Sequence, residues 1–417
     1  MDIIRLLYSL AVSLYGFSIR VASLFNSKAA QWTDGRKDLF ENLKERLSGK
    51  KEVIWVHAAS LGEFEQGRPV IEELRTRYPS AFILLTFFSP SGYLIRKDYD
   101  QADYVTYIPL DTLRKARRFV KTVHPRLAVF IKYEFWYNHL TELSARKIPF
   151  IFISSIFRPS QPFFHWYGGW FRKQLSHASH IFVQNASSKL LLEKAGIRQV
   201  TVSGDTRLDR VVAVAREARD NKKVELFAGD RECLLAGSTW PDDENLLYRL
   251  MESGTISALV IAPHETGADR IREISKRFGR FGVCCYTKAA PEEIATANVM
   301  IIDTIGLLSG LYRYAKICYI GGGFGKGIHN ILEAVTFGKP VIFGPKYEKF
   351  REAVELKSQG GAFPVKDYPE LEKITLRLMS DDDFYQRASK VCTGFVKSNA
   401  GATGRIINTI DLLLGRL

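Results

Sequence analysis

Short, continuously apolar runs alternate with helix-like segments along nearly the whole chain. Runs in which consecutive positions are apolar are typical of parallel strands covered on both faces. Helical spacing of apolar residues follows in segments such as Pro69–Arg77 and Ser187–Ala195. In the first half of the chain the predicted strands are Glu52–His57, Ala81–Phe88, Tyr104–Leu110, Leu127–Glu134, Pro149–Ser155, His180–Asn185 and Val200–Asp205.

The alternation stops once and then restarts, which predicts two domains. Residues 207–225 are charged and helix-prone but show no strand pattern, and we interpret them as a linker. Two arrays of similar size predict an α/β fold of two Rossmann-like domains, residues 29–206 and 226–417. In such sheets ligands bind beyond the carboxyl ends of the strands. After the linker the predicted strands are Glu232–Ser238, Ala258–His264, Gly282–Lys288, Val299–Thr304, Ile317–Gly323 and Pro340–Pro345.

The N-terminal residues 1–28 form a separate apolar segment. Leu6–Ile19 carries no charge and is flanked by Arg5 and Arg20. This run is shorter than the ~20 apolar residues of a spanning helix. We expect a helix buried in, or lying on, the cytoplasmic face of a membrane, with the basic residues at the headgroups. The alternative is a core helix packed on the first domain.

The composition indicates a globular protein with an anionic partner but does not distinguish among several kinds of partner. The chain has 417 residues, of which 46% are hydrophobic and 25% are charged, and this excludes a disordered protein. A net charge of +14 points to an anionic partner: nucleic acid, an acidic membrane face or a phosphorylated substrate. The five cysteines form no CxxC pair, so we interpret them as small buried hydrophobic residues.

The glycine-rich stretch Tyr319–Pro345 is a candidate phosphate-binding loop. A strand ends in three glycines, including Gly322 and Gly323, and we expect a helix from about Asn330 to Phe337. Glycines let a backbone approach a ligand closely, and a helix N-terminus offers N–H groups to phosphate. Lys326 is followed by Gly327 rather than Ser or Thr, which excludes a Walker A loop. Glu333 is placed to accept hydrogen bonds from ribose hydroxyls or, alternatively, is a solvated helix residue.

Several acids and histidines follow strands and are candidates for chemistry. Glu63 lies where a strand passes into a helix, either as a helix cap or as a proton acceptor. Glu134 ends an apolar strand and fits a functional or a structural role equally. His264 follows a strand and is expected to contact phosphate, whereas His57 lies within one and is expected in the core. The acid runs Asp242–Asp243 and Asp381–Asp383 fit helix starts, so no metal site is predicted.

Eight segments together resemble, in order, the Kdo transferases, the 3-deoxy-D-manno-octulosonic acid transferases of lipopolysaccharide synthesis. The resemblance covers essentially the whole chain, and its motifs are specific in combination. The segments are HAASLGEFEQGRPVI, FFSPSGY, KYEFWYN, GDTRLDR, GSTWPDDE, APHE, DTIGLLSGLY and GGGFGKGIHNILEA.

This resemblance implies a GT-B fold, in which an acceptor-binding and a donor-binding Rossmann-like domain face a central cleft. It implies an inverting glycosyltransferase that moves Kdo from CMP-Kdo to the lipid A precursor (lipid IVA) without a metal or other cofactor. The expected partners are CMP-Kdo, the phosphorylated lipid A precursor and an anionic membrane surface, and no nucleic acid. The expected location is the inner membrane, with the catalytic domains on its cytoplasmic face.

Carried over residue by residue, the family's general base falls on Glu63. Glu134 and Arg207 fall in segments thought to help at the transition state. Among four departures from the family pattern, the first acid of E-x-E-x-W is Lys132 here, and Arg207 replaces a lysine. In addition, D-T-x-G-E-L loses its acid at Leu307, and Ile331 replaces the proline of Asn-Pro-Leu-Glu. The nucleotide- and phosphate-binding positions fall on Pro263, His264, Ile305, Gly306, Leu307, Asn330, Ile331, Leu332 and Glu333, beside the loop glycines Gly322 and Gly323.

Two other functions remain open. One is a nucleotide-sugar epimerase on the same two-domain scaffold. The apolar N-terminus argues against it, because a soluble sugar nucleotide needs no membrane. The other is a non-catalytic basic protein that binds nucleic acid, which predicts salt-sensitive binding to oligonucleotides. The sequence contains no recognised nucleic-acid-binding module.

Overall fold

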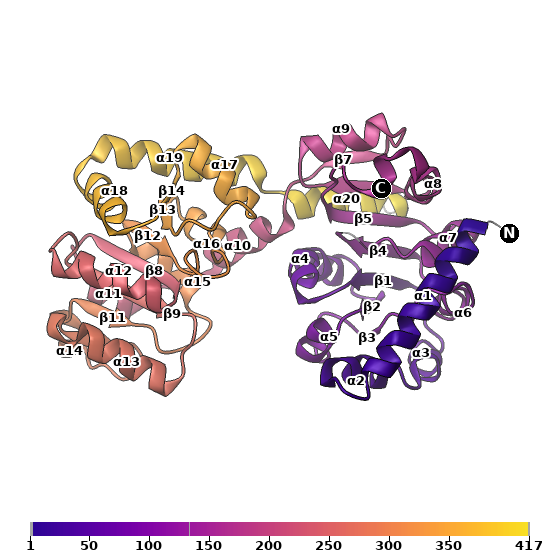
Figure 1. Ribbon diagram of the computed structural model, residues 1–417, viewed down its shortest axis with the longest axis horizontal. Coiled ribbons are helices and arrows are strands. Elements are labelled where there is room, and N and C mark those ends of the chain that lie inside the picture. The colour runs from indigo at the N-terminus through magenta and orange to yellow at the C-terminus, as the bar shows by residue number, and fades with distance from the viewer. Residues whose placement is uncertain (1–2, 133, 416–417) are drawn as a thin grey trace. The chain divides into compact units, whose positions relative to one another are not determined.

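The computed structural model describes residues 3–132 and 134–415, so Met1, Asp2, Tyr133, Arg416 and Leu417 lie outside the description. The chain forms two compact α/β units (Figure 1). The first unit comprises Met1–Asp209 with Ala400–Leu417, and the second comprises Arg210–Asn399. Each unit contains one seven-stranded sheet in which every strand pair is parallel. The predicted fold class of two Rossmann-like α/β units is confirmed.

The sheet of the first unit has the strand order β3-β2-β1-β4-β5-β6-β7. Apolar clusters lie on both of its faces, which explains why its strands read as continuous apolar runs. The strands are β1 (Val53–Ala58), β2 (Phe82–Phe87), β3 (Tyr104–Tyr107), β4 (Leu127–Ile131), β5 (Phe150–Ser155), β6 (His180–Val183) and β7 (Val200–Val202).

Helices cover both faces of this sheet (Figure 1). They are α1 (Ile3–Ala22), α2 (Ser27–Asp34), α3 (Leu39–Arg46), α4 (Leu61–Arg77), α5 (Pro90–Arg96), α6 (Leu113–Val123), α7 (Tyr137–Ala145), α8 (Gly169–Ser176), α9 (Ala186–Lys194) and α20 (Ala402–Leu413), with 3-10 turns at Pro162–Phe164 and Trp166–Gly168.

The second unit repeats the architecture with the order β10-β11-β9-β8-β12-β13-β14. Its strands are β8 (Cys233–Thr239), β9 (Ala258–Pro263), β10 (Val283–Cys285), β11 (Val299–Ile301), β12 (Ile317–Ile320), β13 (Val341–Phe343) and β14 (Ala362–Pro364). Its helices are α11 (Lys222–Ala228), α12 (Pro241–Glu252), α13 (Ala268–Phe278), α14 (Pro291–Thr296), α15 (Leu308–Leu311), α16 (Leu332–Val335), α17 (Arg351–Gln359), α18 (Tyr368–Ser380) and α19 (Asp382–Asn399), with 3-10 turns at Gly279–Phe281 and Tyr312–Tyr314.

The structure differs from the sequence-based expectations in three places. The stretch expected as a linker carries α10 (Thr206–Glu217) and α11, and the boundary between the units falls inside α10. The C-terminal helix α20 packs with the first unit, although the domain expected over residues 226–417 placed it in the second. The helix expected from Asn330 to Phe337 is only the short α16, because the glycine-rich segment before it folds as turns.

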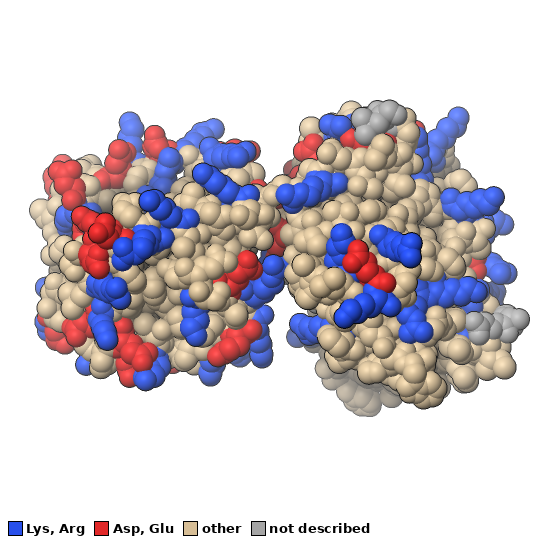
Figure 2. Space-filling model, turned by 90° about the horizontal axis from the view of Figure 1, so that it is seen from above, with Lys and Arg blue, Asp and Glu red and all other residues tan. Residues whose placement is uncertain are grey.

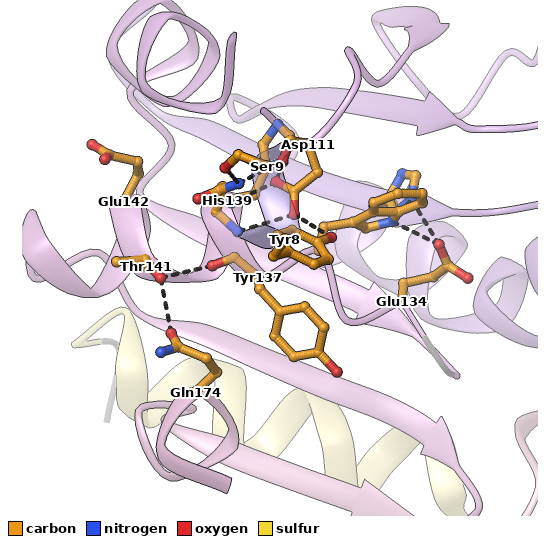
Figure 3. Close-up of polar contacts among 12 residues, drawn as sticks. Tyr8, Ser9, Asp111, Glu134, Tyr137, His139, Thr141, Glu142 and Gln174 are labelled. Atoms are coloured by element: carbon orange, nitrogen blue, oxygen red, sulfur yellow. Dashed lines mark hydrogen bonds and ion pairs between the residues drawn. The ribbon is translucent and has the colours of Figure 1, made fainter. Parts of the chain in front are cut away.

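Helix α1 lies along the outside of the first unit and is held there by polar side chains (Figures 1 and 3). The Tyr8 hydroxyl donates to the buried Asp111 carboxylate at 2.8 Å, and the Asn138 amide donates to Ser9 Oγ at 3.0 Å. Gly16 is buried against Leu110, where a Cβ would lie 2.3 Å from Cδ1. Most of the helix is exposed, so it is not a buried core helix, although it packs on the first unit as the alternative expected.

The exposed side of α1 is strongly apolar. By length and composition α1 is the one helix in the described residues that is apolar enough to cross a membrane. This finding is consistent with membrane association. The exposed apolar residues are Ile3, Ile4, Leu6, Leu7, Leu10, Leu14, Tyr15, Phe17 and Val21, followed by Leu24 and Phe25.

Candidate active site

Glu63 lies in the first turn of α4, directly beyond the carboxyl end of β1. Its side chain is one-fifth exposed, so the carboxylate is partly shielded but still open to solvent. The Ser60 hydroxyl donates to Oε2 of Glu63, and the Lys132 ammonium lies 3.8 Å from Oε1. The Glu63 carboxylate therefore lies between the Ser60 hydroxyl and the Lys132 ammonium. It is at the ligand edge of the sheet, the edge formed by the carboxyl ends of the strands, where ligands bind in such folds.

Glu134 is held in the interior of the first unit. Its Oε2 accepts a hydrogen bond from Trp136 Nε1 at 2.7 Å and lies 3.2 Å from His57 Nε2 (Figure 3). His57 is fully buried, as expected of a core histidine, and its Nδ1 lies 2.9 Å from Thr86 Oγ1. These contacts favour the structural role for Glu134, because both of its described polar partners are buried or partly buried side chains.

Arg207 is the second residue of α10 and forms an ion pair with Asp205. Its Nη2 lies 2.6 Å from Asp205 Oδ2, and its Nε donates to the same oxygen at 2.9 Å. The neighbouring Thr206 is buried, with its hydroxyl 2.9 Å from Ser154 Oγ and also donating to the Gln66 carbonyl. The guanidinium is therefore oriented by a carboxylate while remaining about one-third exposed.

In the second unit the glycines after β12 are required by close backbone packing. A Cβ on Gly321 would lie 2.3 Å from the Ser238 carbonyl oxygen, and one on Gly323 would lie 2.6 Å from Gly344 Cα. Gly322 has φ +89°, a left-handed conformation that favours glycine. Packing thus accounts for Gly321 and Gly323, and Gly322 is the member of the triplet that lines a cavity.

Asp243 holds this loop in place. Its buried carboxylate accepts hydrogen bonds from the Gly322 amide at 2.9 Å and from the Tyr319 hydroxyl at 2.8 Å. It also caps α12 by accepting from the Trp240 amide at 2.9 Å. The sequence signal identified the helix cap but not the contact with the glycine loop, because that contact joins residues 79 positions apart.

A cavity of about 550 Å³ opens beside this loop. His264 stacks on Trp240 and on His329, with ring centroids 4.7 and 4.5 Å apart. Trp240 Nε1 donates to His329 Nε2 at 3.1 Å. Burial lowers the pKa of His329, and the neighbouring His264 lowers it further, so His329 is a neutral acceptor. The cavity is lined by Trp240, His264, Gly322, Gly325, Lys326, Gly327 and His329.

The predicted site residues His264 and Gly322 line the same cavity, and Pro263 lies at the end of β9. Trp240 and His329 are site residues that the sequence analysis did not single out. A signal was present, since Trp240 directly follows β8 and His329 precedes Asn330 in the glycine-rich motif.

The predicted Asn330–Glu333 segment presents two polar side chains. Asn330 Nδ2 donates to Glu333 Oε1 at 3.0 Å, and Asn330 Oδ1 accepts from the Leu332 amide at 3.1 Å. Burial raises the pKa of Glu333, although its hydrogen bonds oppose the rise. Ile331 and Leu332 are buried, so their side chains pack in the interior of the unit and do not face a ligand.

The predicted Ile305–Leu307 segment borders a different hollow. Ile305 is exposed, and Gly306 adopts a left-handed conformation with φ +92°. Gly306 and Leu307 line a cavity of about 360 Å³ together with parts of α10 and α15. The predicted nucleotide-binding residues are therefore distributed over separate parts of the second unit.

The fold places the chain among GT-B-like proteins. It is similar to the crystal structure of UDP-GlcNAc 2-epimerase from Neisseria meningitidis, at 17% identity and a TM-score of 0.60, over 86% of this chain and 99% of that chain. It is also similar to a putative UDP-N-acetylglucosamine 2-epimerase from Listeria monocytogenes, at 13% identity and a TM-score of 0.58, over 88% and 98% of the two chains.

Sequence comparison finds similarity to one family of transferases. Residues 38–210 match the family described as 3-Deoxy-D-manno-octulosonic-acid transferase (kdotransferase). The 3-deoxy-D-manno-octulosonic acid transferase of Aquifex aeolicus is 26% identical over 81% of this chain and 89% of its own length. That of Haemophilus influenzae is 25% identical over 87% of each chain. By sequence the chain is therefore similar to the 3-deoxy-D-manno-octulosonic acid (Kdo) transferases over most of its length.

Proposed function

We propose that this protein is an inverting glycosyltransferase that moves Kdo from CMP-Kdo to the lipid A precursor, with Glu63 as general base. The observation that carries the proposal is the position of Glu63, a partly exposed acid at the ligand edge of a parallel sheet, within residues 38–210, which match the Kdo transferase family. Its capping and catalytic roles are compatible, because an acid in the first turn interacts favourably with the helix dipole and still faces the edge of the sheet where ligands bind.

In the proposed reaction the acceptor hydroxyl gives its proton to Glu63 as its oxygen attacks the anomeric carbon of Kdo. The bond from that carbon to the phosphate oxygen breaks on the opposite face, and CMP leaves with the electron pair. One glycosidic bond replaces one phosphate ester bond, with inversion at the anomeric carbon. No step requires a metal ion or other cofactor.

The leaving CMP needs positive charge and N–H donors around its phosphate. The cavity of the second unit offers Lys326, His264 and the backbone of the glycine loop. Asn330 and Glu333 are proposed to bind the ribose, since a carboxylate and an amide can accept and donate hydrogen bonds to its hydroxyls. Arg207 is proposed to stabilise the developing negative charge.

The acceptor is a phosphorylated lipid, and we assign the protein to the cytoplasmic face of the inner membrane. The exposed apolar face of α1 would enter the acyl boundary, while its docked polar side chains keep the helix lying on the surface. The neighbouring α6 carries five basic residues and no acidic one. On the face drawn in Figure 2, basic side chains on the first unit clearly exceed acidic ones. Both features suit an anionic leaflet.

Glu63→Gln tests the assignment of the base. The substitution keeps size and polarity but removes the proton acceptor, so transfer should fall by about 10²- to 10⁴-fold. CMP binding measured by calorimetry should stay nearly unchanged, because the residues proposed to bind the nucleotide belong to the second unit. Transfer is followed by mass measurement of the lipid product after incubation with CMP-Kdo and lipid A precursor.

Glu65→Gln is the matched control. Glu65 lies two residues further along α4 and pairs with Arg96 at 2.8 Å, so its loss should leave transfer within about twofold. A Glu63→Gln enzyme that retains most of its activity would show that another group is the base. Epimerised UDP-sugar formed without an acceptor would instead favour the epimerase function.

A further inference from the structure

Two aromatic side chains stand in solvent at the tip of a loop in the first unit. Trp166 is 93% exposed, and the neighbouring Tyr167 is 53% exposed. The loop follows β5 at the ligand edge of the sheet and contains the two 3-10 turns that precede α8. Trp and Tyr have an apolar ring and a polar tip, so they are enriched where a protein surface meets an apolar partner.

The loop that carries Trp166 is held by specific contacts. Arg172 Nη1 donates to the carbonyls of Phe163 and His165, at 2.8 and 3.0 Å. Phe163 is buried in the apolar cluster on one face of the sheet. Gly168 is packed so closely that a Cβ would lie 2.0 Å from a backbone carbonyl oxygen of the same loop. The fold therefore secures the base of the loop and holds the Trp166 side chain outward.

The same loop packs against α1. Trp170, four residues after Trp166, contacts Tyr8 of α1 and Tyr137 of α7, with ring centroids 5.9 and 4.9 Å apart. Tyr8 and Tyr137 also contact each other (Figure 3). Ile4 lies one turn before Tyr8 on the same side of α1 and is 46% exposed. The loop tip and the exposed apolar face of α1 are therefore neighbouring parts of one surface.

The charge around the loop suits an anionic bilayer. Residues 143–192, which include β5, the loop and α8, contain six Lys or Arg residues and no Asp or Glu. Arg158 and Lys173, on either side of the tip, are exposed. The surface of an anionic bilayer combines phosphate charge with an adjoining apolar layer, and Trp and Tyr favour that boundary. A bilayer also meets both the tip and the 20-residue α1 without the shape complementarity that a protein partner would need.

We propose that the tip formed by Trp166 and Tyr167 is a second membrane contact, which enters the headgroup layer of an anionic bilayer beside α1. The inference rests on the membrane location proposed above. A single helix on a membrane surface leaves the attached domain free to rock about the helix axis, whereas a helix and a separate tip together fix its orientation. Because the loop follows the carboxyl end of β5, this contact holds the ligand edge of the first unit near the headgroups, where a lipid acceptor lies.

Fluorescence tests whether Trp166 enters the bilayer. The vesicles consist of phosphatidylethanolamine and phosphatidylglycerol, with or without bromine near the top of the acyl chains, where it quenches only tryptophans close to it. The chain has six tryptophans, so the emission of Trp166 is obtained by subtracting that of Trp166→Phe, which keeps an aromatic ring. We expect the subtracted emission to shift to shorter wavelength on vesicle binding and to be quenched by the brominated lipid.

Cosedimentation with the same vesicles measures what the tip contributes to binding. Trp166→Ala should weaken partition onto the vesicles by about five- to thirtyfold, while α1 supplies the remaining binding. Trp166→Glu should weaken it further, because the anionic surface repels the added charge. Leu376→Ala is the control: this leucine is 47% exposed on α18 of the second unit, and its loss should leave binding unchanged.

The outcomes distinguish this inference from the proposed membrane location. If the unchanged protein binds vesicles but Trp166 is not quenched, or if Trp166→Ala binds as well as the unchanged protein, the second contact is overturned and the location stands. If the unchanged protein does not bind vesicles, the location itself is overturned. A loss of transfer in Trp166→Ala to lipid A precursor dispersed in detergent, where no bilayer is present, would also contradict the inference, because it would show that the tip contacts the acceptor.

Discussion

Strained residues mark the ligand edges of both sheets. Lys132, Ser154 and Ser238 all have positive φ, and they lie at the carboxyl ends of β4, β5 and β8. Such conformations are unfavourable by about 1–3 kcal/mol each and persist only where surrounding contacts impose them. The Ser154 hydroxyl contacts that of Thr206. The Lys132 amide donates to the Ile153 carbonyl, and Ser155 Oγ donates to the Lys132 carbonyl. Three of the six described non-glycine residues with positive φ therefore lie at the strand ends where the proposed catalytic and phosphate-binding groups are found.

Mild acid should break the hydrogen bond from Trp240 Nε1 to His329 Nε2. Burial and the neighbouring His264 lower the pKa of His329 in the folded protein below about 6.5, the ordinary value for histidine. As the pH falls below about 6.5, the unfolded chain therefore takes up a proton before the folded protein does. The stability contributed by neutral His329 is therefore present above that pH and is lost below it. Protonation also removes the acceptor for Trp240 Nε1, a loss of about 1 kcal/mol.

We expect the fluorescence of Trp240 and the melting temperature of the second unit to change between about pH 6.5 and pH 5. Trp240→Phe supplies the difference spectrum, since the chain has six tryptophans. His329→Gln keeps an acceptor but does not titrate, and it should flatten the acid transition. An equal transition in His329→Gln would show that His264 or another group is responsible.

At the scale of elements, apolar periodicity located every strand except β14. That strand, Ala362–Pro364, ends in a proline, a residue that is uncommon within strands, so its short apolar run was not recognised as one. Periodicity also placed Glu63 and His264 at strand ends, where the structure has them. It could not reveal the Trp240–His329 pair or the Asp243 contact, because these join segments that only the folded sheet brings together. The docking of α1 through Asp111 was hidden for the same reason.

Helix α1 should detach when its polar contacts are removed. The double variant Arg5→Met with Tyr8→Phe eliminates the bonds to Asn138, Glu142 and Asp111. Losing these charge-assisted bonds should weaken docking by about 2 kcal/mol. Tryptic cleavage after Arg20 in detergent should then become roughly 30-fold faster.

Ser13→Ala with Ser18→Ala is the matched control for this helix. These hydroxyls bond only to carbonyls of α1 itself among the described contacts, so their loss should leave cleavage unchanged. Equal cleavage of the double variant and the unchanged protein would contradict docking through the Asp111 network.

On the scale of the whole molecule, the chain enters the second unit within α10 and returns to the first after Asn399. The first unit is therefore discontinuous and is completed by α20. Ile406, Ile407 and Ile410 of this helix belong to the apolar cluster on one face of the first sheet. Its buried Asp411 lies 2.6 Å from Arg77 Nη2 and accepts from the Tyr78 hydroxyl at 2.5 Å. The last helix thus ties the C-terminus to α4, the helix that carries Glu63.

Truncation after Asn399 should unfold the first unit and leave the second folded. The three isoleucines each contribute about 1.5–3 kcal/mol by burial, a sum comparable with the whole stability of a domain. Calorimetry should show that the unfolding transition of the first unit is lost and that the transition of the second unit persists.

Ile410→Ala is a smaller change and should lower only the free energy of unfolding of the first unit, by about 2–5 kcal/mol. Leu412→Ala, two residues along the same helix and exposed, should change neither transition. If the truncated chain kept both transitions, α20 would be an accessory of the first unit rather than a part of its core, and Glu63 would not depend on the C-terminus for its support.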